Sequence, residues 1–304
     1  MGHNDTMLAS HQRATPLELE PAFAVAGVTA AFHAVDLASG REVAHRADDL
    51  VVTASVFKLP VLIELCRQHV SGEVDATKPV HIPSAGRAAG PTGVSVMNDP
   101  MTVSLRDLAW LMMGVSDNGA TDVICERVGL DNVNGLLRRL GLTRTRIDGD
   151  CHDLYRTANE DLGGELDGGP ITRDMVERVR ALDPDRALQV STPREITTLL
   201  RMIWLDEAAP GEACREARRI LSLQVWPHRL ASGFADLDAV TTSGKTGTLI
   251  PTIRNEVGVV EYPDGGQYAV AVFTRSRALR RKNAAADAVI GQAARLAVDW
   301  LRSG

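Results

Sequence analysis

The stretch VVTASVFKLPVLIEL, residues 51–65, places Lys58 three positions after Ser55 inside a run that otherwise has the pattern of a buried helix. A lysine is costly to bury without a partner, so one interpretation is that its stem lies over the core and its ammonium reaches solvent. The second interpretation is that Lys58 acts on the Ser55 hydroxyl, because residues at i and i+3 share a helix face. If burial and a nearby cation lower its pKa, Lys58 can take the proton of the Ser55 hydroxyl.

Two further stretches bear on this Ser-Lys pair. In VSDNGATDVI, residues 115–124, a Ser-Asp-Asn sequence lies between two predicted helices, and in TTSGKTGTLI, residues 241–250, a Lys-Thr-Gly sequence enters a predicted strand. The chain contains four lysines, and two of them, Lys58 and Lys245, fall within these motifs. One S-x-x-K spacing is a weak signal, but the three motifs together indicate a nucleophilic serine site.

The ordered set S-x-x-K, S-D-N and K-T-G resembles the penicillin-recognising serine hydrolases, and in particular the class A β-lactamases. The resemblance covers nearly the whole chain, because MTVSLRDL, TRTRID, STPREITTLLRMI and the C-terminal hairpin follow in the class A order. It implies an α/β (α+β) fold, in which an antiparallel sheet has flanking helices and an inserted all-helical domain. It also implies a serine hydrolase that forms an acyl-enzyme with a β-lactam or a related amide or ester.

The resemblance implies a catalytic role for three side chains. Ser55 would attack a carbonyl carbon, Lys58 would accept its proton, and Ser116 would relay a proton to the leaving nitrogen. The backbone N–H groups of Ser55 and Thr248 would form the oxyanion hole.

Substrate binding is implied for a second group of residues. Asn118 would hydrogen-bond a substrate amide, while Lys245 and Thr246, in the motif that ends at Gly247, would bind a substrate carboxylate. Arg254, nine residues after Lys245, lies where many class A enzymes place a second carboxylate-binding cation. Its other interpretation is a surface salt-bridge arginine. The predicted partner is therefore a small molecule with a carboxylate, and the oligomeric state stays open.

One departure from the class A pattern concerns the step after acylation. Class A enzymes carry a glutamate and then an asparagine in the loop after TRID, and the glutamate activates the hydrolytic water. In TRIDGDCHDLY, residues 145–155, Cys151 stands at the apparent position of the glutamate and Tyr155 at that of the asparagine. A slip of one or two residues would recruit Asp150 or Asp153 instead. Cys151 itself is interpreted as a small, half-buried thiol.

The chemistry of a cysteine at this position differs from that of a glutamate. To act as a base the thiol must ionise, and we expect the predicted cations Lys245 and Arg254 to stabilise such a thiolate without making it a good base for water. The sequence DCHD offers two adjacent soft ligands without a partner pair elsewhere, so neither a metal nor a cofactor is predicted.

The same loop is also longer than in class A enzymes. More than thirty residues lie between Tyr155 and STPREI, where class A enzymes have about a dozen. They include the Gly-rich, acidic stretch 159–170, which is long enough to be mobile, and the helix-like stretch 171–182. A longer loop beside the site should reshape access for substrate.

Alternating patterns around turn residues predict hairpins over residues 27–48 and 256–276, which should share one antiparallel sheet. Helical spacing predicts a helix over 283–301 that packs on this sheet. Further predicted helices, several with polar caps, cover 101–115, 119–129, 132–141 and 191–205. The resulting division is a flexible tail at 1–15, an α/β domain from 16–50 and 229–304, and a helical domain over 51–228.

Composition limits the remaining possibilities. With 44% hydrophobic and 24% charged residues the chain resembles a soluble globular protein, and its net charge of −6 argues against nucleic acid as a partner. The N-terminal residues lack the apolar segment of a signal peptide or membrane anchor, so the expected location is the cytoplasm, or outside the cell if a leader has been removed. The four cysteines lack paired spacing and are expected to be reduced thiols.

Three functional hypotheses follow. The first is a β-lactamase-like enzyme acting on amides or esters, in which the acyl group passes to water or to another acceptor. The second is a binding protein whose acyl-enzyme persists, so that it traps or senses β-lactams. The third, a DD-peptidase acting on cell-wall peptides, is disfavoured because no export signal is seen.

Overall fold

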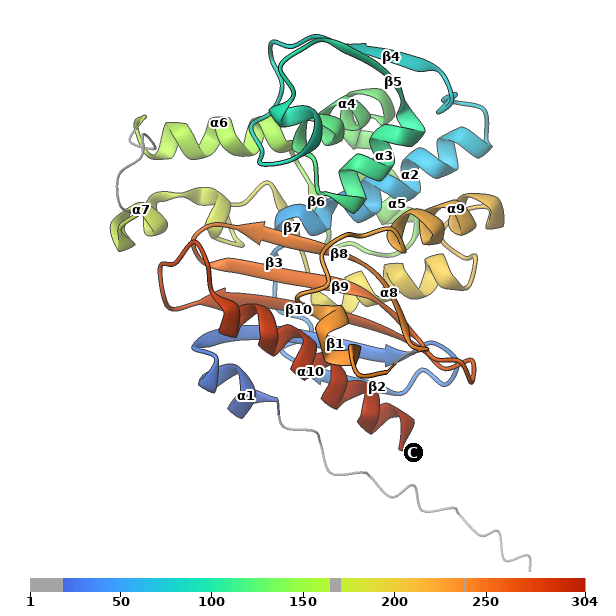
Figure 1. Ribbon diagram of the computed structural model, residues 1–304, viewed down its shortest axis with the longest axis vertical. Coiled ribbons are helices and arrows are strands. Elements are labelled where there is room, and N and C mark those ends of the chain that lie inside the picture. The colour runs from blue at the N-terminus through green and yellow to red at the C-terminus, as the bar shows by residue number, and fades with distance from the viewer. Residues whose placement is uncertain (1–18, 165–170, 238, 304) are drawn as a thin grey trace, which may run out of the picture.

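The computed structural model describes residues 19–164, 171–237 and 239–303. A sheet made from both ends of the chain forms the lower half of Figure 1, and helices from the middle of the chain form the upper half. This arrangement confirms the predicted α/β class with an antiparallel sheet and flanking helices. The predicted tail at 1–15 and residues 165–170 of the predicted Gly-rich loop lie outside the described residues.

The strands of the main sheet are β1 (Val28–Asp36), β2 (Glu42–His45), β8 (Thr241–Leu249), β9 (Ile253–Glu261) and β10 (Gln267–Ser276). They are all antiparallel to their neighbours, in the order β2-β1-β10-β9-β8. Both predicted hairpins are present, as β1 with β2 and as β9 with β10. The Lys-Thr-Gly motif lies on β8, which is an edge strand and leaves one row of backbone groups free for other partners.

Both faces of this sheet are buried. On β10, Ala269, Ala271 and Phe273 join the core beneath the helical half, whereas Val270 and Val272 join the core on the opposite face. Successive side chains of a strand point to opposite faces, so a continuous apolar run is what a sheet covered on both sides requires.

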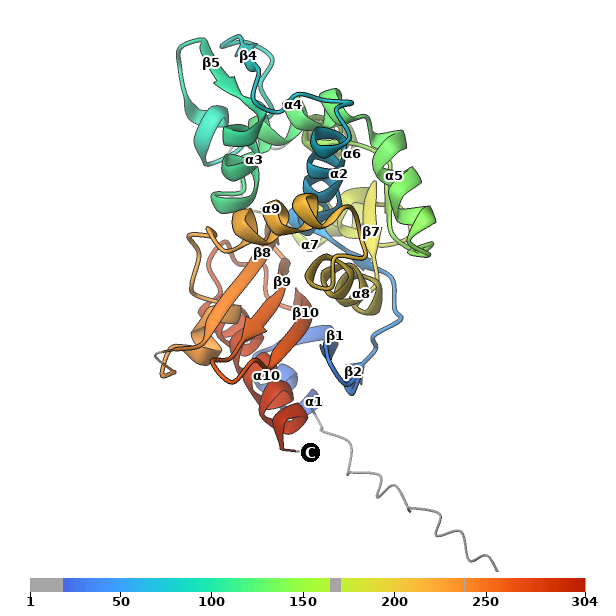
Figure 2. The same cartoon turned by 90° about the vertical axis from the view of Figure 1, so that its right-hand side faces the viewer.

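The helix α10 (Ala284–Arg302) and the short helix α1 (Glu20–Val25) cover one face of the sheet, as Figure 2 shows. Ile290, Ala293 and Ala297 follow the helical repeat along α10 and are buried against this face. The prediction that residues 283–301 form a helix on the sheet is therefore confirmed.

The remaining helices are α2 (Lys58–Val70), α3 (Leu105–Gly114), α4 (Asn118–Val128), α5 (Leu130–Arg139), α6 (Cys151–Asp161), α7 (Arg173–Arg178), α8 (Pro193–Trp204) and α9 (Gly211–Leu221). The helix α8 lies against β1 and β10, and its residues Leu199 and Leu200 are buried in the core between the two halves. In the described residues no helix is both long enough and apolar enough to cross a membrane.

The stretch 51–65 is not one continuous helix. Residues Val51–Val52 form the short strand β3, Ala54–Phe57 form the 3-10 turn η1, and α2 begins at Lys58. Ser55 thus lies in the turn that leads directly into α2, as the chemical interpretation requires.

The predicted helical segment 51–228 also contains two small sheets. One joins β3 to β7 (Gln189–Ser191) and β6 (Arg146–Ile147), and the other pairs β4 (Pro79–Ile82) with β5 (Met101–Ser104). The predicted helix over 101–115 is therefore wrong in its first four residues, which form β5, and the helix-like stretch 171–182 holds only α7 and the 3-10 turn η3 (Arg180–Leu182). The domain boundaries themselves stay predictions.

Candidate active site

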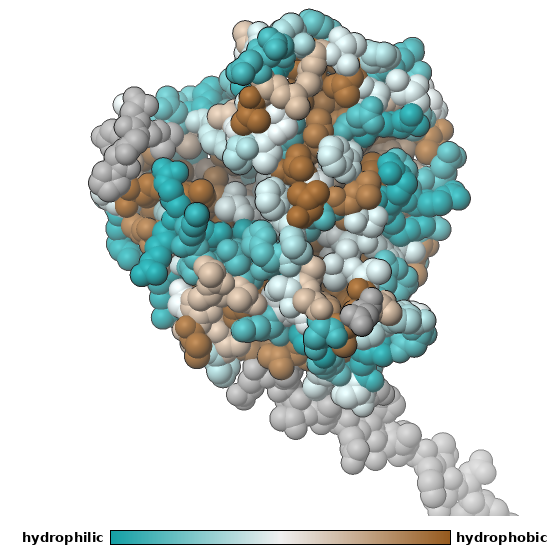
Figure 3. Space-filling model, viewed as in Figure 1, coloured by the Kyte–Doolittle hydropathy of each residue, from teal (hydrophilic) through white to brown (hydrophobic). Residues whose placement is uncertain are grey.

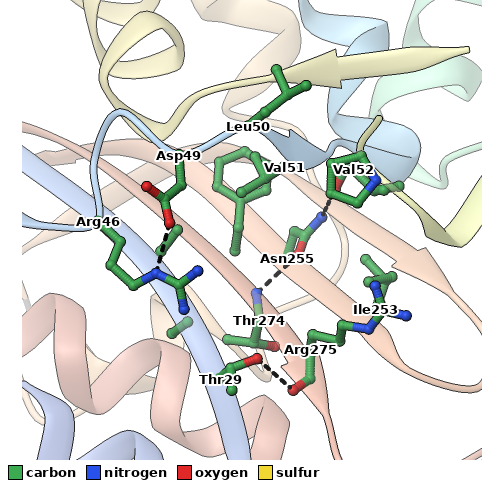
Figure 4. Close-up of a pocket in the computed structure, with 14 residues that line it drawn as sticks. Thr29, Arg46, Asp49, Leu50, Val51, Val52, Ile253, Asn255, Thr274 and Arg275 are labelled. Carbon is green, nitrogen blue, oxygen red and sulfur yellow. Dashed lines mark hydrogen bonds and ion pairs between the residues drawn. The ribbon is translucent and has the colours of Figure 1, made fainter. Parts of the chain in front are cut away.

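Ser55 lies in a strained turn that the sheet holds in place. Ala54, which precedes it, has a φ of 46°, a left-handed conformation that costs a residue with a side chain about 1–3 kcal/mol. Asn255 of β9 donates from Nδ2 to the carbonyl oxygens of Val52 and Thr53, at 3.0 and 3.1 Å, while its Oδ1 accepts from the Thr274 N–H. Figure 4 shows Asn255 between Val52 and Thr274, in the wall of a separate pocket of about 210 Å³.

Lys58 is wholly buried, so its ammonium does not reach solvent and the first interpretation of this lysine is wrong. Its Nζ donates to the Ser116 carbonyl oxygen and to Asn118 Oδ1, both at 2.8 Å. Burial lowers the pKa of Lys58, although the nearby negative charge of Asp117 opposes this effect. The neutral amine that a general base needs is therefore easier to reach here than in water.

The Ser-Asp-Asn motif joins α3 to α4, and its asparagine is the first residue of α4. Ser116 has a φ of 62°, and Asp117 caps α4 by accepting from the Ala120 N–H at 3.3 Å. Asp117 also accepts from the Val94 N–H at 2.5 Å, which ties the motif to the 3-10 turn η2 (Gly93–Val96). The strained serine is thus held between the two helix ends.

Lys245 reaches the same place from the sheet. It is wholly buried on β8, and its Nζ donates to Ser116 Oγ at 2.9 Å and to the Thr246 carbonyl oxygen at 2.8 Å. Burial, followed by the nearby charge of Lys58, lowers its pKa well below the usual range. Ser116 therefore lies between two buried lysines, as a proton relay requires.

Gly247 allows β8 to approach the turn of Ser55. A Cβ at this position would come within 2.7 Å of the Thr53 carbonyl oxygen, so a side chain would push the strand away. Thr246 directs its N–H toward the outer edge of β8, where it donates to Gln224 Oε1 at 2.7 Å. Thr248, two residues along the strand, directs its N–H toward the same edge, which is the orientation that the predicted oxyanion hole needs.

A cavity of about 620 Å³, the active-site cavity, joins these groups. Five of the predicted site residues line it: Ser55, Ser116, Asn118, Thr246 and Thr248. Lys58 and Lys245 lie behind this wall and reach it through Ser116.

Arg254 is not in the wall of this cavity as the structure describes it. Its side chain is buried, pairs with Asp287 of α10 at 3.3 Å and donates to the Arg281 carbonyl oxygen at 2.6 Å. The structure therefore supports neither of the two interpretations of Arg254, because its guanidinium neither faces the cavity nor lies at the surface.

Arg229, which the sequence analysis did not single out, is a buried cation near the motifs. It lines the active-site cavity, and its Nη2 donates to Thr248 Oγ1 at 2.7 Å. Its Nε donates to Asp287 at 2.7 Å, and its Nη1 donates to the Gly247 carbonyl oxygen at 3.1 Å. Nothing in its sequence context, the short polar stretch WPHRL, predicts this position.

Cys151 begins α6 and lies close to Lys58. Its Sγ is 3.4 Å from Asn118 Oδ1, which also accepts from Lys58, and the residue is 4% exposed. Burial raises the pKa of this thiol to about 12, despite the nearby charge of Lys58. Cys151 is therefore an uncharged thiol at neutral pH, as the sequence predicts, but it is buried and not half-buried. The stabilisation by nearby cations that a thiolate was expected to gain is outweighed by desolvation.

The two aspartates that the sequence offered as alternative bases cap the start of α6 instead. Asp150 and Asp153 form a reciprocal capping box at the start of α6, in which each side chain accepts from the backbone N–H of the other. Asp153 also pairs with Arg156 at 2.9 Å. Sequence reasoning missed Asp122 of α4, which accepts from the Cys151 and His152 N–H groups at 2.9 Å and whose pKa burial raises to about 6.

A second cavity, the water-sized cavity of about 30 Å³, adjoins Ser55. Its polar lining comes from Ser55, Asn118, Cys151, Tyr155 and Thr248, and its volume is about that of one water molecule in the liquid. Asn118 Nδ2 donates to Tyr155 Oη at 3.4 Å across this space. Among the described residues, no carboxylate lines the water-sized cavity, and no group of three metal-binding side chains lies close enough together to hold a metal ion.

Glu256 is a second buried carboxylate near the motifs. It lies opposite Thr246 in the sheet, its Oε1 accepts from Gln224 at 2.6 Å, and its Oε2 accepts from the Leu230 N–H at 2.5 Å. Burial raises its pKa to about 7. Because Gln224 also accepts from Thr246, Glu256 holds the Lys-Thr-Gly strand through one intermediate side chain.

This shift makes stability depend on pH. The pKa of Glu256 in the folded protein, about 7, exceeds its ordinary value of 4.5. The stabilisation that protonated Glu256 contributes is therefore complete below pH 4.5 and is lost as pH rises through 7. We expect the free energy of unfolding of the wild type, relative to Glu256→Gln, to fall by on the order of 3 kcal/mol between pH 4 and pH 8. Urea unfolding of both proteins at each pH measures this difference, and a pH-independent difference would contradict it.

The beta-lactamase enzyme family matches residues 18–301 of the chain. The chain is 33% identical to "Beta-lactamase regulatory protein BlaB" of Streptomyces cacaoi, over 94% of this chain and 96% of that protein. It is 28% identical to "Beta-lactamase" of Amycolatopsis lactamdurans, over 88% and 79% of the two chains. The structure of the class A β-lactamase from Mycobacterium abscessus superimposes with a TM-score of 0.74, at 19% identity over 94% and 98% of the chains. With this fold, and with the family match spanning nearly its whole length, the chain belongs to the beta-lactamase enzyme family.

Proposed function

We propose that the protein forms an acyl-enzyme between Ser55 and the carbonyl carbon of a β-lactam, and releases the acyl group only slowly. The observation that carries the first half is the convergence of Ser55, Lys58, Ser116 and Lys245 at one cavity. The observation that carries the second half is the water-sized cavity, which offers a thiol where a base is needed.

In this proposal, acylation uses the side chains of the three motifs. Ser55 Oγ attacks the lactam carbonyl carbon while its proton passes to neutral Lys58, and the N–H groups of Ser55 and Thr248 bind the developing oxyanion. When the C–N bond breaks, the ring nitrogen takes a proton through Ser116, which hydrogen-bonds Lys245 at 2.9 Å and lies 3.5 Å from Lys58 Nζ. No atom leaves, so the adduct has the mass of a whole β-lactam molecule.

The substrate carboxylate binds at the end of β8. Thr246 and Thr248 offer hydroxyl groups to the cavity, and Arg229 stands behind Thr248 as a buried cation. Arg281 lines the same wall from the loop before α10. A planar guanidinium matches a carboxylate well, so in this proposal Arg229 takes the role predicted for Arg254.

Among the residues that the structure describes, the water-sized cavity offers no carboxylate as a base for deacylation. A water in the water-sized cavity would meet the Cys151 thiol, whose pKa of about 12 leaves it protonated at neutral pH. Asp122 lies close enough to interact with Lys58 electrostatically, but both its oxygens accept backbone N–H groups at the start of α6. The acyl-enzyme therefore persists.

A regulatory role is the second candidate function. A protein that keeps its acyl group reports β-lactam by a lasting covalent change, and a fast enzyme does not. The relative from Streptomyces cacaoi, 33% identical over nearly the whole length, is named a regulatory protein. Both features favour a β-lactam-responsive regulator over an enzyme whose purpose is turnover.

Cys151→Glu tests the proposal. We expect the substitution to speed the slow steady state of penicillin hydrolysis by about tenfold or more, because a carboxylate beside the water-sized cavity supplies the missing base, while the initial burst is unchanged. Stopped-flow absorbance at the β-lactam band separates the two phases. Cys151→Gln is the matched control, with the same shape and no basic group, and an equal acceleration in that variant would refute the assignment.

A further inference from the structure

A cavity of about 600 Å³, the three-helix cavity, lies where α2, α3 and α9 meet. It shares no lining residue with the active-site cavity. Figure 2 shows α9 beside α2 and α3, and on the right of Figure 3 apolar atoms lie between hydrophilic side chains over α3 and α9. Cavities of about 300–1,000 Å³ commonly hold small molecules, so the three-helix cavity has the size of a ligand site.

The inner wall of the three-helix cavity is apolar. Leu65 of α2, Ala109 of α3 and Ile220 of α9 line it, and each is at most 2% exposed. Cys66 adds a buried thiol, and burial raises the pKa of this thiol to about 12, so it is uncharged at neutral pH. Because a polar group buried without a partner is costly, a molecule that lies on this wall must have a hydrocarbon body.

The exposed side of the three-helix cavity is charged. Its lining contains three arginines and two glutamates, which are Arg106, Arg215, Arg219, Glu212 and Glu216. Arg219 binds Glu216 through Nε and Nη2, both at 2.7 Å. These hydrogen bonds lower the pKa of Glu216, and the charge of Arg106 adds to the shift. Charged groups of α3 and α9 therefore meet at one place in the cavity.

The positive charges of this lining are not fully balanced. Among residues 19–164, 171–237 and 239–303, the side chains of Arg106 and Arg215 make neither a hydrogen bond nor an ion pair. Because Glu216 pairs with Arg219, Glu212 is the one carboxylate of the described lining that is left for both of them. The arginines thus exceed the glutamates by one, and a ligand with a single negative charge would balance the lining.

We propose that the three-helix cavity is a second ligand site, which binds a small molecule with a hydrocarbon body and one negative charge. The body lies against the inner wall, and the anionic group binds between Arg106 and Arg215. A guanidinium matches the planar geometry of a carboxylate, so a carboxylate is the favoured anion. Since the site shares no residue with the active-site cavity, its binding is measured without any β-lactam and does not depend on the proposed acyl-enzyme.

The test compares three molecules with the same hydrocarbon chain and different charge. Decanoate is the anion, decan-1-ol is the neutral molecule and decylammonium is the cation. Isothermal titration calorimetry of the full chain, with decanoate below its micelle concentration, should give one site per protein molecule. We expect decan-1-ol to bind about tenfold more weakly and decylammonium more weakly still, because only the carboxylate accepts charge-assisted hydrogen bonds from the arginines.

Two variants locate the binding in the three-helix cavity. Arg106→Gln/Arg215→Gln changes two exposed positions and should weaken decanoate binding about tenfold, while decan-1-ol binding is unchanged. Val70→Trp fills the cavity from a half-buried position and should abolish the binding of both. Arg127→Gln/Arg138→Gln, which removes two exposed arginines from α4 and α5, is the matched control and should bind as the wild type does.

The outcomes decide the assignment. A single decanoate site that weakens in folded Arg106→Gln/Arg215→Gln, and not in its control, supports the proposal even if Val70→Trp does not fold. The proposal is overturned if decanoate does not bind the wild type or if decylammonium binds as tightly as decanoate. Wild-type affinity for decanoate in folded Arg106→Gln/Arg215→Gln would overturn it as well.

Discussion

Ser55→Ala is expected to abolish covalent labelling by penicillins completely. The turn that carries Ser55 is held by Asn255 and by the close approach of Gly247, and neither contact uses the Ser55 hydroxyl. The hydroxyl makes no hydrogen bond within the described residues, so its removal should leave the fold intact and remove only the nucleophile. The measurement is the intact mass after incubation with benzylpenicillin.

Ser303→Ala, an exposed serine beyond the end of α10, is the control and should label fully. A thermal melt of Ser55→Ala that matches the wild type shows that the loss is chemical. Labelling of the folded Ser55→Ala protein at the wild-type level would identify another nucleophile and overturn the assignment.

Lys58→Ala should slow acylation about a hundredfold or more, within the range for the loss of a general base. Lys58 is the buried amine that begins the helix directly after the turn of Ser55, and burial lowers its pKa. The Ser116 carbonyl oxygen and Asn118 Oδ1 both accept a hydrogen bond from Lys58 Nζ, and both lose it in this variant. Rates of adduct formation by quenched mass spectrometry measure the effect.

Lys78→Ala removes one of the other three lysines, an exposed one outside the motifs, and should acylate at the wild-type rate. The pH dependence of the acylation rate is a second measurement, and a purely structural role of Lys58 would not affect it. Because the neutral amine is the base and its pKa is lowered, the wild-type acylation rate should rise with pH and level off below pH 10.5, the ordinary lysine pKa. A wild-type rate in folded Lys58→Ala would show that another group takes the proton.

The three motifs, the two hairpins and the C-terminal helix could be predicted because each depends on a pattern of residues close together in the sequence. Alternation fixed β1 with β2 and β9 with β10, and the 3.6-residue repeat fixed α10. The stretch 51–65 could not be resolved in this way. Its apolar run fits a buried helix, and only the tertiary hydrogen bonds of Asn255 and the left-handed Ala54 separate strand, turn and helix within it.

Some site residues were predicted wrongly because their environment depends on burial in the folded protein. A local sequence pattern does not show this burial. Arg229 and Arg254 both pair with Asp287, but only Arg229 lines the active-site cavity, whereas Arg254 is directed to the Arg281 backbone. Cys151 was predicted to be a half-buried thiol whose thiolate form nearby cations would stabilise, but it is buried, and desolvation outweighs the charge of Lys58. The sequence does contain one indication that Glu256 is buried, because this carboxylate begins the apolar strand sequence EVGVV.

The proposed mechanism explains how acylation can occur while deacylation is slow. The proposed acylation uses groups positioned by the contact of β8 with η1 and by the loop between α3 and α4. The proposed deacylation depends on the start of α6, where the helix is capped by Asp150 and held by Asp122, while its first side chain is an uncharged thiol. The two steps therefore depend on different segments and can change independently.

The most direct test of this account is a time course of intact mass after mixing the wild-type protein with about a tenfold excess of benzylpenicillin. The account predicts that nearly every molecule gains the mass of one whole penicillin, that about one equivalent of β-lactam is consumed in the first phase, and that the adduct persists while consumption continues slowly. Rapid consumption of all the penicillin without an accumulating adduct, or no adduct at all, would contradict it.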